Sequence, residues 1–482
     1  MRRTVTVLSP PGARPLAFAA VVLLPALLAL LLPGGALGAK APKPGWTSAA
    51  ASGRLVQLPG ERGCLVDRSV SAGSCGTARA LAGAGPFMGS RAIAVSEDGR
   101  NVYVASSRSD AIAIFTRNRR TGALTQPAGT GGCVAAKASN GCGRAVGLDG
   151  PNSVALSPGG RFLYATSRAA NSVTAFRRNT STGALTQLPP GSGCFSGIPI
   201  PGCAAGRALV APDVVAVSPD GANVYVGSFF GNAVAIFQRA RNGVLYQASD
   251  ASGCIAEAIE GCAPAVALGA PEGLAVSPDG ANVYVAGALS SSVAELVREP
   301  ATGALSQPGD GSGCIVDVAL AGCTTGVQLS GANAVAIAPA GRDVYVTSLF
   351  SNSVTSFGRS AAGLLTQKPG THACMVYLRS VGCSFGRAMI APEGVAVSPD
   401  GSSVYLAAFK SGAIDVLDRD RESGFLAQKA GRAGCLAARR VPGCGTGRAL
   451  RGVSSIAVSP DGRSVYSTSF ASNAVNVFRR KR

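Results

Sequence analysis

Residues 153–187 read SVALSPGGRFLYATSRAANSVTAFRRNTSTGALTQ, which is four apolar segments separated by turn residues. The first segment ends at the turn Ser157-Pro158-Gly159-Gly160, and the second runs from Phe162 to Thr166. Pro suits the second position of a type I turn and Gly the fourth, so these two segments are expected to pair as antiparallel strands. The third segment, Ser172 to Arg177, and the fourth, Leu185-Thr186-Gln187, follow with a Thr-Gly turn between them.

This pattern occurs seven times, and the Tyr of its second strand marks each copy. The marker residues are Tyr103, Tyr164, Tyr225, Tyr284, Tyr345, Tyr405 and Tyr466, at intervals of 61, 61, 59, 61, 60 and 61 residues. Four antiparallel strands in about 60 residues form one blade of a β-propeller. The sequence therefore predicts an all-β fold, a seven-bladed propeller with four strands per blade.

The last copy ends at Arg482 without a Leu-x-Gln strand, and that missing strand stands near the start as Leu55-Val56-Gln57. We expect the N-terminal strand to close the ring by completing the last blade. The second and third strands carry apolar runs rather than strict alternation, as strands do when both sheet faces are buried. The seven Tyr are therefore expected to pack between blades.

The N-terminus has the features of an export signal. Arg2, Arg3 and Arg14 precede an uncharged apolar run from Leu16 to Leu32, and Ala36-Leu37-Gly38 offers small residues for cleavage. We expect a signal peptide at 1–39, a linker at 40–53 and the propeller at 54–482. The mature chain, with no membrane span, would be secreted or lie in the cell envelope. Retention of the apolar run as an anchor is the alternative.

The cysteines agree with export, because all 14 fall into seven local pairs. An even, regularly spaced set in an exported chain indicates a disulfide framework, and the spacings do not suit zinc. The expected disulfides are Cys64-Cys75, Cys133-Cys142, Cys194-Cys203, Cys254-Cys262, Cys314-Cys323, Cys374-Cys383 and Cys435-Cys444. They lie in the long connections between blades, which we expect to form a crown of clipped loops on one face.

The net charge of +19 falls to +16 when the three arginines of the predicted signal are removed. For an exported protein this favours anionic cell-surface polymers as partners, with a plainly solvated basic surface as the alternative. A protein or a small lactone are the other partners considered. Nucleic acid is excluded by the compartment and by the absence of a recognition motif. We expect a monomer.

Phe162-Leu163-Tyr164-Ala165, Asn171-Ser172-Val173 and Thr182-Gly183-Ala184-Leu185-Thr186-Gln187 closely resemble the lactonase-like seven-bladed propellers. That family includes bacterial 6-phosphogluconolactonases and cycloisomerases of carboxymuconate type. Val344-Tyr345-Val346-Thr347 also resembles the related YVTN surface propellers, which are often binding or adhesion domains. The resemblance implies the fold and a possible lactone hydrolysis. The export signal, the paired cysteines and the positive charge depart from the cytosolic sugar-phosphate enzymes.

The start of each first strand should ring the mouth of the central channel, where a ligand would bind. The residues at this position are Arg91, Asn152, Asp213, Glu272, Asn333, Glu393 and Ser454. Calcium prefers six to eight oxygen ligands of this kind, so Asn152, Asp213, Glu272, Asn333 and Glu393 form a candidate Ca²⁺ site. Exported lactonases of another propeller family use a comparable set, which implies that Asp213, Glu272 or Glu393 could be a catalytic ligand or base. A polar, water-filled channel in which Arg91 pairs with a carboxylate is the alternative.

A second recurrence is an Arg shortly after the second Cys of a pair, a candidate anion-binding set comprising Arg79, Arg144, Arg207, Arg387 and Arg448. Binding of loop carbonyls is the alternative role, and the one we favour. His372 is the only His, and no Gly-x-Ser-x-Gly motif accompanies it. The sequence thus favours an exported binding or scaffold propeller, with a metal-assisted lactone or ester hydrolase as the alternative. Hydrolysis requires the three carboxylates to converge and to be open, whereas binding predicts that the crown loops narrow the mouth.

Overall fold

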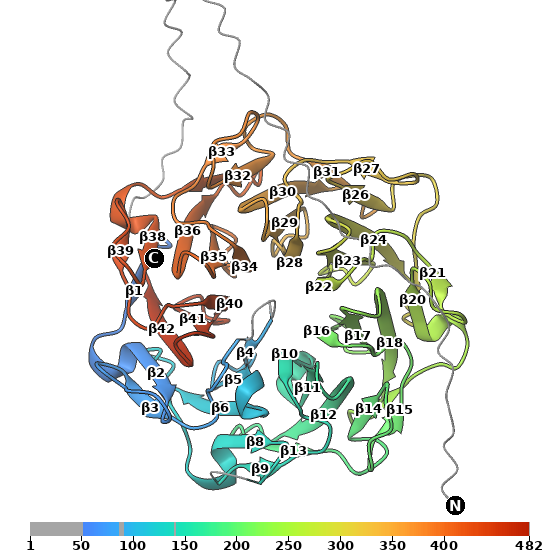
Figure 1. The fold of residues 1–482 in the computed structure, drawn as a ribbon, viewed down its shortest axis with the longest axis horizontal. Coiled ribbons are helices and arrows are strands. Elements are labelled where there is room, and N and C mark those ends of the chain that lie inside the picture. Colours follow the sequence, from blue (N-terminus) through green and yellow to red (C-terminus); the bar gives the residue numbers. More distant parts are fainter. Residues whose placement is uncertain (1–51, 86–90, 139–140, 482) are drawn as a thin grey trace, which may run out of the picture. The chain divides into compact units, whose positions relative to one another are not determined.

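The structure, a computed structural model, describes residues 52–85, 91–138 and 141–481. The predicted signal peptide and most of the predicted linker lie outside the described residues. Seven six-stranded sheets surround a common axis, which confirms the predicted seven-bladed propeller (Figure 1). Helical segments among the described residues are short 3-10 turns, namely η1 (Gly60–Gly63), η2 (Ser107–Ser109), η3 (Gly129–Gly132), η4 (Pro158–Gly160), η5 (Ala251–Gly253) and η6 (Gly431–Ala433).

We number the blades in chain order and letter the six strands of each blade a to f. Blade 1 comprises β4 (Ile93–Val95), β5 (Asn101–Ser106), β6 (Ala111–Arg117), β7 (Leu124–Thr125), β8 (Cys133–Ala135) and β9 (Gly143–Arg144). Blade 2 comprises β10 (Pro151–Leu156), β11 (Phe162–Ser167), β12 (Ser172–Arg178), β13 (Leu185–Gln187), β14 (Cys194–Ser196) and β15 (Ala204–Ala205). Blade 3 comprises β16 (Pro212–Val217), β17 (Asn223–Ser228), β18 (Ala233–Arg239), β19 (Leu245–Tyr246), β20 (Cys254–Ala256) and β21 (Ala263–Pro264).

The remaining blades repeat this order. Blade 4 comprises β22 (Pro271–Val276), β23 (Asn282–Gly287), β24 (Ser292–Arg298), β25 (Leu305–Ser306), β26 (Cys314–Val316) and β27 (Thr324–Thr325). Blade 5 comprises β28 (Ala332–Ile337), β29 (Asp343–Ser348), β30 (Ser353–Arg359), β31 (Leu365–Gln367), β32 (Cys374–Val376) and β33 (Ser384–Phe385). Blade 6 comprises β34 (Pro392–Val397), β35 (Ser403–Ala408), β36 (Ala413–Arg419), β37 (Leu426–Gln428), β38 (Cys435–Ala437) and β39 (Gly445–Thr446). Blade 7 comprises β40 (Val453–Val458), β41 (Ser464–Ser469) and β42 (Ala474–Arg480), together with β1 (Leu55–Gln57), β2 (Cys64–Asp67) and β3 (Gly76–Ala78) from the N-terminus.

The blades thus have six strands rather than the predicted four. Strands a, b and c form an antiparallel meander, d pairs with the second half of c, and e pairs with its first half. In blade 2, Phe176 faces Gln187 and Val173 faces Phe195. Strands e and f could not be recognised in the sequence, because each is only two to four residues long and lies in a connection rich in Gly, Pro and Cys.

The ring closes as predicted, and the N-terminal segment contributes more strands to the last blade than the one predicted. Strand β1 pairs with β42, with Leu55 opposite Arg480, so the N-terminal strand does complete the last blade. The N-terminal segment also supplies β2, antiparallel to β42, and β3, parallel to β2. Half of the strands in blade 7 therefore come from each end of the described chain.

All seven predicted disulfides are present. In blade 2, Cys194 begins strand e and Cys203 stands one residue before strand f, so the bond ties the parallel pair e–f together. Strand e ends beside the start of strand c, so the e–f loops share a face with the b–c loops. The clipped loops therefore lie on one face, as predicted, but Figure 1 places strands e and f at the outer edge of the ring and not around the channel mouth.

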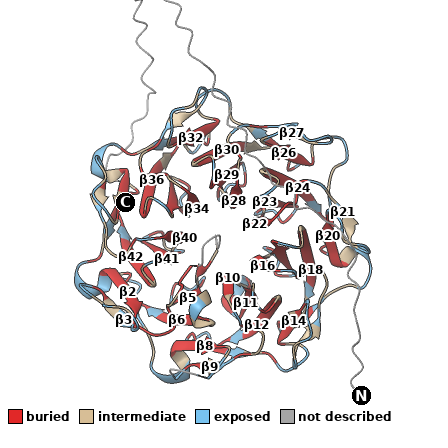
Figure 2. Ribbon diagram, viewed as in Figure 1, coloured by how far each residue is buried: buried red, intermediate tan, exposed pale blue. Residues whose placement is uncertain are grey.

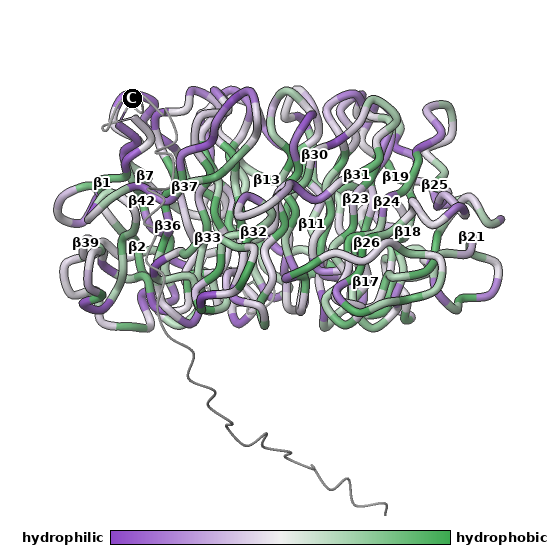
Figure 3. The backbone as a smooth tube through the Cα atoms, turned by 90° about the horizontal axis from the view of Figure 1, so that it is seen from above, coloured by the Kyte–Doolittle hydropathy of each residue, from purple (hydrophilic) through white to green (hydrophobic). Residues whose placement is uncertain are grey.

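The apolar core lies between the blades, where buried residues of adjacent blades form common clusters. Figure 2 shows that most strands are buried, and Figure 3 shows hydrophobic residues along them. All seven marker Tyr are fully buried, as expected for residues that pack between blades. Each also takes part in a contact with the next blade that the sequence did not predict. Tyr103 donates from its hydroxyl to the carbonyl of Gly183 at 2.8 Å, and it accepts from Nε of Arg178 at 2.7 Å.

Candidate functional site

The predicted channel-mouth residues occupy a special place in the backbone. In six blades, the pairing of strands a and b skips one residue, a β-bulge that leaves this residue out of the ladder. The skipped residues are Asn152, Asp213, Glu272, Asn333, Glu393 and Ser454, and Arg91 stands just before β4. Bulges re-aim side chains and are frequent beside functional sites. The six bulged residues are all buried, with exposed fractions of 0–3%.

Several ring residues contact one another or the neighbouring blade. The Asn152 side-chain amide donates to Asp213 Oδ1, and Arg168 Nη1 lies 3.7 Å from the same oxygen. Asn333 donates to the carbonyl of Pro392 at 3.1 Å, which links blades 5 and 6. Ser454 donates to the carbonyl of Gly85 at 2.8 Å. The ring is thus a chain of contacts between blades as well as a candidate site.

Two of the ring carboxyls, Asp213 and Glu272, have raised pKa values. Burial raises the pKa of Asp213 to about 7, although the Arg168 guanidinium and the Asn152 amide oppose the shift. Burial also raises the pKa of Glu272 well above its ordinary value, and the nearby Asp213 and Glu393 carboxylates raise it further. Burial lowers the pKa of Arg91. Glu272 therefore lies within electrostatic reach of both Asp213 and Glu393, as expected for groups at one channel mouth.

The ring does not fit a calcium site. Over residues 52–85, 91–138 and 141–481, no three His, Cys, Asp or Glu side chains come close enough together to hold a metal ion. Calcium also requires oxygen ligands that can turn toward the ion. The Asn333 side chain is already engaged at both ends, because its Oδ1 accepts from Thr347 at 2.8 Å and its amide donates to Pro392. We therefore derive no metal-dependent step.

The central channel is a cavity of about 450 Å³ lined by the first strands of all seven blades. Its wall is apolar apart from Arg91, the one charged residue among its lining residues. No ion pair joins Arg91 to a carboxylate within the described part of the chain, and its Nη2 lies 3.4 Å from the carbonyl of Val335. The predicted closure by an Arg91–carboxylate pair is not what the geometry shows.

The arginines after the second Cys have mainly structural contacts. In four blades this arginine donates to backbone carbonyls of the next blade, as Arg207 does to Ala248 at 2.8 Å and to Asp250 at 2.5 Å. Arg79, Arg387 and Arg448 make equivalent bonds. Arg144 stands two positions nearer to its Cys and is exposed. His372 stacks on Phe425 of the next blade, with ring centroids 3.8 Å apart.

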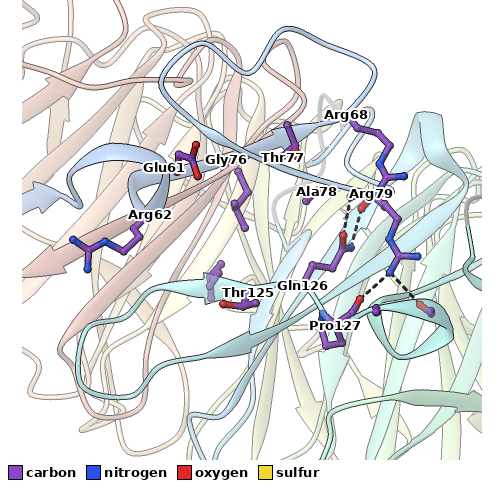
Figure 4. Close-up of a pocket in the computed structure, with 14 residues that line it drawn as sticks. Glu61, Arg62, Arg68, Gly76, Thr77, Ala78, Arg79, Thr125, Gln126 and Pro127 are labelled. Atoms are coloured by element: carbon purple, nitrogen blue, oxygen red, sulfur yellow. Dashed lines mark hydrogen bonds between the residues drawn. The ribbon is translucent and has the colours of Figure 1, made fainter.

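A pocket larger than the central channel lies elsewhere, at the outer edge where the ring closes. It has a volume of about 680 Å³ and lies between β3 of blade 7 and β7 of blade 1. Figure 4 shows Arg62 and Arg68 toward opposite ends of it, with Arg79 bonded to the Pro127 carbonyl. Arg62 and Arg68 are exposed and form no ion pair with the other described residues, and Glu61 is the only acid in the lining.

A second groove flanks the other side of the same N-terminal strands. It has a volume of about 470 Å³, lies between β1 and β39, and includes Arg54, Arg432 and Arg448 but no acid in its lining. The closing blade therefore has an arginine-lined groove on each side. Sequence reasoning singled out Arg79 and Arg448 but missed Arg54, Arg62, Arg68 and Arg432, because these four do not recur at one position of the repeat.

Residues 267–441 match the family model described as "Lactonase, 7-bladed beta-propeller". No curated protein matches the sequence. A putative 6-phosphogluconolactonase from Bacteroides fragilis has a similar structure, with 16% identity over 79% of this chain and 90% of that chain and a TM-score of 0.54. A putative 6-phosphogluconolactonase from Bacteroides uniformis has 18% identity over 81% and 91% of the two chains, with a TM-score of 0.50.

Hydrazine synthase from Kuenenia stuttgartiensis is as similar in structure, with 18% identity over 82% of this chain and 96% of that chain and a TM-score of 0.50. At such identities the likeness concerns the fold alone. No helix in the described ranges is both long and apolar enough to cross a membrane. The seven disulfides indicate an oxidising compartment outside the cytoplasm. The match of residues 267–441 to the family model and the ring of seven blades together confirm the predicted resemblance to the lactonase-like seven-bladed β-propellers.

Proposed function

We propose that this protein is an exported, non-catalytic binding or scaffold module that holds an anionic cell-surface polymer. The observation that carries the proposal is the pair of arginine-lined grooves on either side of the N-terminal strands of blade 7. Arginine is suited to this role because its planar guanidinium binds carboxylate and phosphate groups in a bidentate manner. Two grooves separated by one blade favour an extended ligand with repeated anionic groups over a small anion.

The recurring residues support this division of roles. The buried arginines at the ends of the third strands are paired with the preceding blade, as Arg298 is with Asp220 at 2.6 Å. These pairs contribute little net charge to the surface. The excess positive charge therefore resides on exposed arginines such as Arg54, Arg62, Arg68 and Arg432, which face solvent beside the grooves.

The test compares charge reversal at the grooves with charge reversal elsewhere. We expect the full chain to bind immobilised polygalacturonate and not neutral dextran, with affinity falling steeply as salt rises. Replacing one arginine of each groove, Arg62→Glu with Arg432→Glu, should weaken binding at least ten-fold. The control, Arg241→Glu with Arg342→Glu, changes the net charge equally at exposed positions away from both grooves. Equal losses in the two variants would indicate non-specific charge attraction and reject the grooves as the site.

A hydrolase centred on the channel mouth is the second candidate. It is favoured by Asp213, whose pKa of about 7 suits general acid or base chemistry near neutral pH, and by the two glutamates beside it. The burial of these carboxyls argues against a hydrolase, because Asp213, Glu272 and Glu393 are at most 1% exposed. A substrate would have to displace neighbouring groups to reach these carboxyls.

Substitution separates the two candidates. Glu272→Gln with Glu393→Gln preserves side-chain shape, so it should leave polymer binding unchanged. A panel of simple lactones should show no turnover by the full chain. Turnover that disappears in the double variant would instead make the channel mouth an active site.

A further inference from the structure

We propose that the face carrying the b–c and e–f loops, here called the loop face, docks on an anionic lipid surface. The proposal goes beyond polymer binding at the grooves, and Arg68 is the one residue that it shares with their lining. It is based on two loop positions that recur in every blade. At each position the side chain is apolar in some blades and cationic in others.

The first position is the second residue of each b–c loop, which lies at the tip of the loop. It is a large apolar residue in three consecutive blades, where Phe230, Leu289 and Phe350 are 69%, 70% and 64% exposed. In blades 6 and 1 the same position is Lys410 and Arg108, both exposed. Blades 2 and 7 have Ala at this position.

The second position is the fourth residue after the first Cys of each pair, in the e–f loop. It is Ile198, Val318 and Leu378 in blades 2, 4 and 5, with exposed fractions of 45%, 77% and 67%. In blades 6, 7 and 1 it is a cation, and in blade 3 it is Ala258. The three cations are Arg439, Arg68 and Lys137, all exposed.

The two positions lie on one face because the loops are joined in every blade. The third residue after the first Cys of each pair donates its N–H to the backbone carbonyl of the last residue of the b–c loop. Gly197 bonds in this way to Asn171 at 2.8 Å, and Ala438 bonds to Gly412 at 2.9 Å. All seven b–c loops have four residues and join strands of nearly equal length. The loop tips therefore lie at a similar height around the ring, and a flat surface can contact many of them together.

The partition of side chains indicates what that surface is. Large apolar side chains are exposed over blades 2 to 5, and cations replace them over blades 6, 7 and 1. Exposed apolar patches mark interaction sites. Aliphatic and Phe side chains beside Lys and Arg are typical of proteins that lie in the interface of an anionic bilayer. A protein partner would favour Tyr and Trp at such positions, and the exposed tips of the loop face have neither.

The acidic residues in the b–c and e–f loops are few, and none lies in those loops of blades 6 and 7, although Asp110 lies in the b–c loop of blade 1. Glu257 and Glu260 are exposed in the e–f loop of blade 3, and Asp149 is exposed before blade 2. Asp110 is half-buried and accepts from the N–H of Gly150 at 2.9 Å. Blade 3, with Ala258 between two acids, is the weakest part of the proposed contact.

The test measures co-sedimentation of the full chain with vesicles. Wild type should bind vesicles of equal parts phosphatidylglycerol and phosphatidylcholine at least ten-fold better than pure phosphatidylcholine vesicles. Phe230→Ser with Leu289→Ser and Phe350→Ser should lower binding at least ten-fold. Lys410→Glu with Arg439→Glu should remove the preference for the anionic lipid. Both variants leave the grooves intact, so polygalacturonate binding should not change.

The control is again Arg241→Glu with Arg342→Glu, at turns on the opposite face of the ring. All variants keep the N-terminal residues, so differences between them report the loop face and not the apolar run at 16–32. Thermal unfolding of each variant should match wild type because the substituted side chains are exposed. Vesicle binding that is insensitive to both loop-face variants would overturn the proposal. So would a concentration-dependent dimer that the triple variant abolishes, which would assign the apolar tips to a second copy of the chain.

Discussion

At the scale of single residues, the least expected feature is the arginine that ends each third strand. These residues are Arg117, Arg178, Arg239, Arg298, Arg359, Arg419 and Arg480. Each one reaches into the preceding blade, where its Nε donates to the hydroxyl of the marker Tyr. In five blades the guanidinium also pairs with the Asp of the Asp-Gly turn. The turn that links strands a and b therefore also holds neighbouring blades together.

Two seams lack the turn aspartate. Arg419 pairs with Asp343 instead, whereas Arg239 forms no ion pair with the other described residues and offers a natural comparison. Arg239 contacts Tyr164 like its equivalents, but Gly159 stands where most other copies have Asp. We expect Arg298→Met to lower the free energy of unfolding by about 2–4 kcal/mol, because it removes several buried hydrogen bonds and an ion pair. Arg239→Met should cost roughly 1 kcal/mol less, since no ion pair is lost. Denaturant unfolding of both variants checks this, and equal costs would show that the aspartate contributes nothing.

Glu295 gives a prediction of pH dependence. It lies in β24 at the seam between blades 4 and 5, where Leu365 donates its N–H to Oε2 at 2.8 Å. Burial raises its pKa to about 8, which the hydrogen bond from Leu365 only partly offsets. Because the folded protein holds this proton more tightly than the unfolded chain, the stabilisation is present below the ordinary pKa and is lost as pH rises toward 8.

The variant Glu295→Gln keeps an acceptor for Leu365 and does not titrate. Its unfolding free energy should be close to wild type near pH 5 and higher by roughly 2–4 kcal/mol at pH 9. Thermal unfolding between pH 5 and pH 9 measures the difference. Parallel pH profiles for the two proteins would show that Glu295 is not the titrating group.

At the scale of elements, the Gln of the Leu-x-Gln strand joins each blade to the one before it. Gln307 accepts from the N–H of Val266 at 2.7 Å and donates to its carbonyl at 3.1 Å, as a neighbouring strand would. The equivalent pair of bonds is present at all seven seams. The recurrence of Gln in the repeat thus has a structural cause.

Gln307→Glu replaces the donating amide with an oxygen that faces two carbonyls. It should destabilise the protein by about 1–3 kcal/mol, because the carbonyls of Val266 and Gly313 lose their donor. The neighbouring Ser306 is exposed, so Ser306→Glu adds the same charge without breaking a bond and should cost less than about 0.5 kcal/mol. Thermal unfolding compares the two variants. Similar losses of unfolding free energy would show that the Gln307 amide does not join the blades.

At the scale of the whole propeller, closure depends on strands from both ends of the described chain. Leu55 is buried against Tyr405, Ile456 and Phe478, and the Tyr405 hydroxyl donates to the Gly53 carbonyl at 2.7 Å.

Charge is also distributed unevenly around the ring. Residues 242–341 contain nine acids and a single cation, Arg298, whereas the grooves of blade 7 are basic.

Leu55→Ala and Leu305→Ala remove the same buried side chain from equivalent strands of blades 7 and 4. Each should cost about 2–5 kcal/mol. Only Leu55→Ala should also speed proteolytic release of the N-terminal strand. The strand β1 is held in blade 7 by pairing with β42, whereas β25 is joined by the chain on both sides to other strands of its own blade. Limited proteolysis with mass spectrometry checks this. Equal resistance of the two variants would mean that the seam is as firmly closed as any other.

The repeat made the number of blades, the closing strand and the disulfide pairs predictable. Turn residues and a fixed repeat length can both be recognised in the amino-acid sequence alone. The sequence also placed Asp213, Glu272 and Glu393 at equivalent positions near the axis. It could not show that a β-bulge removes each from the ladder, or that each is buried. Those properties depend on which blade packs against which. In the same way, the arginine grooves and the divided loop face join residues from blades far apart in sequence, and only closure of the ring brings them together.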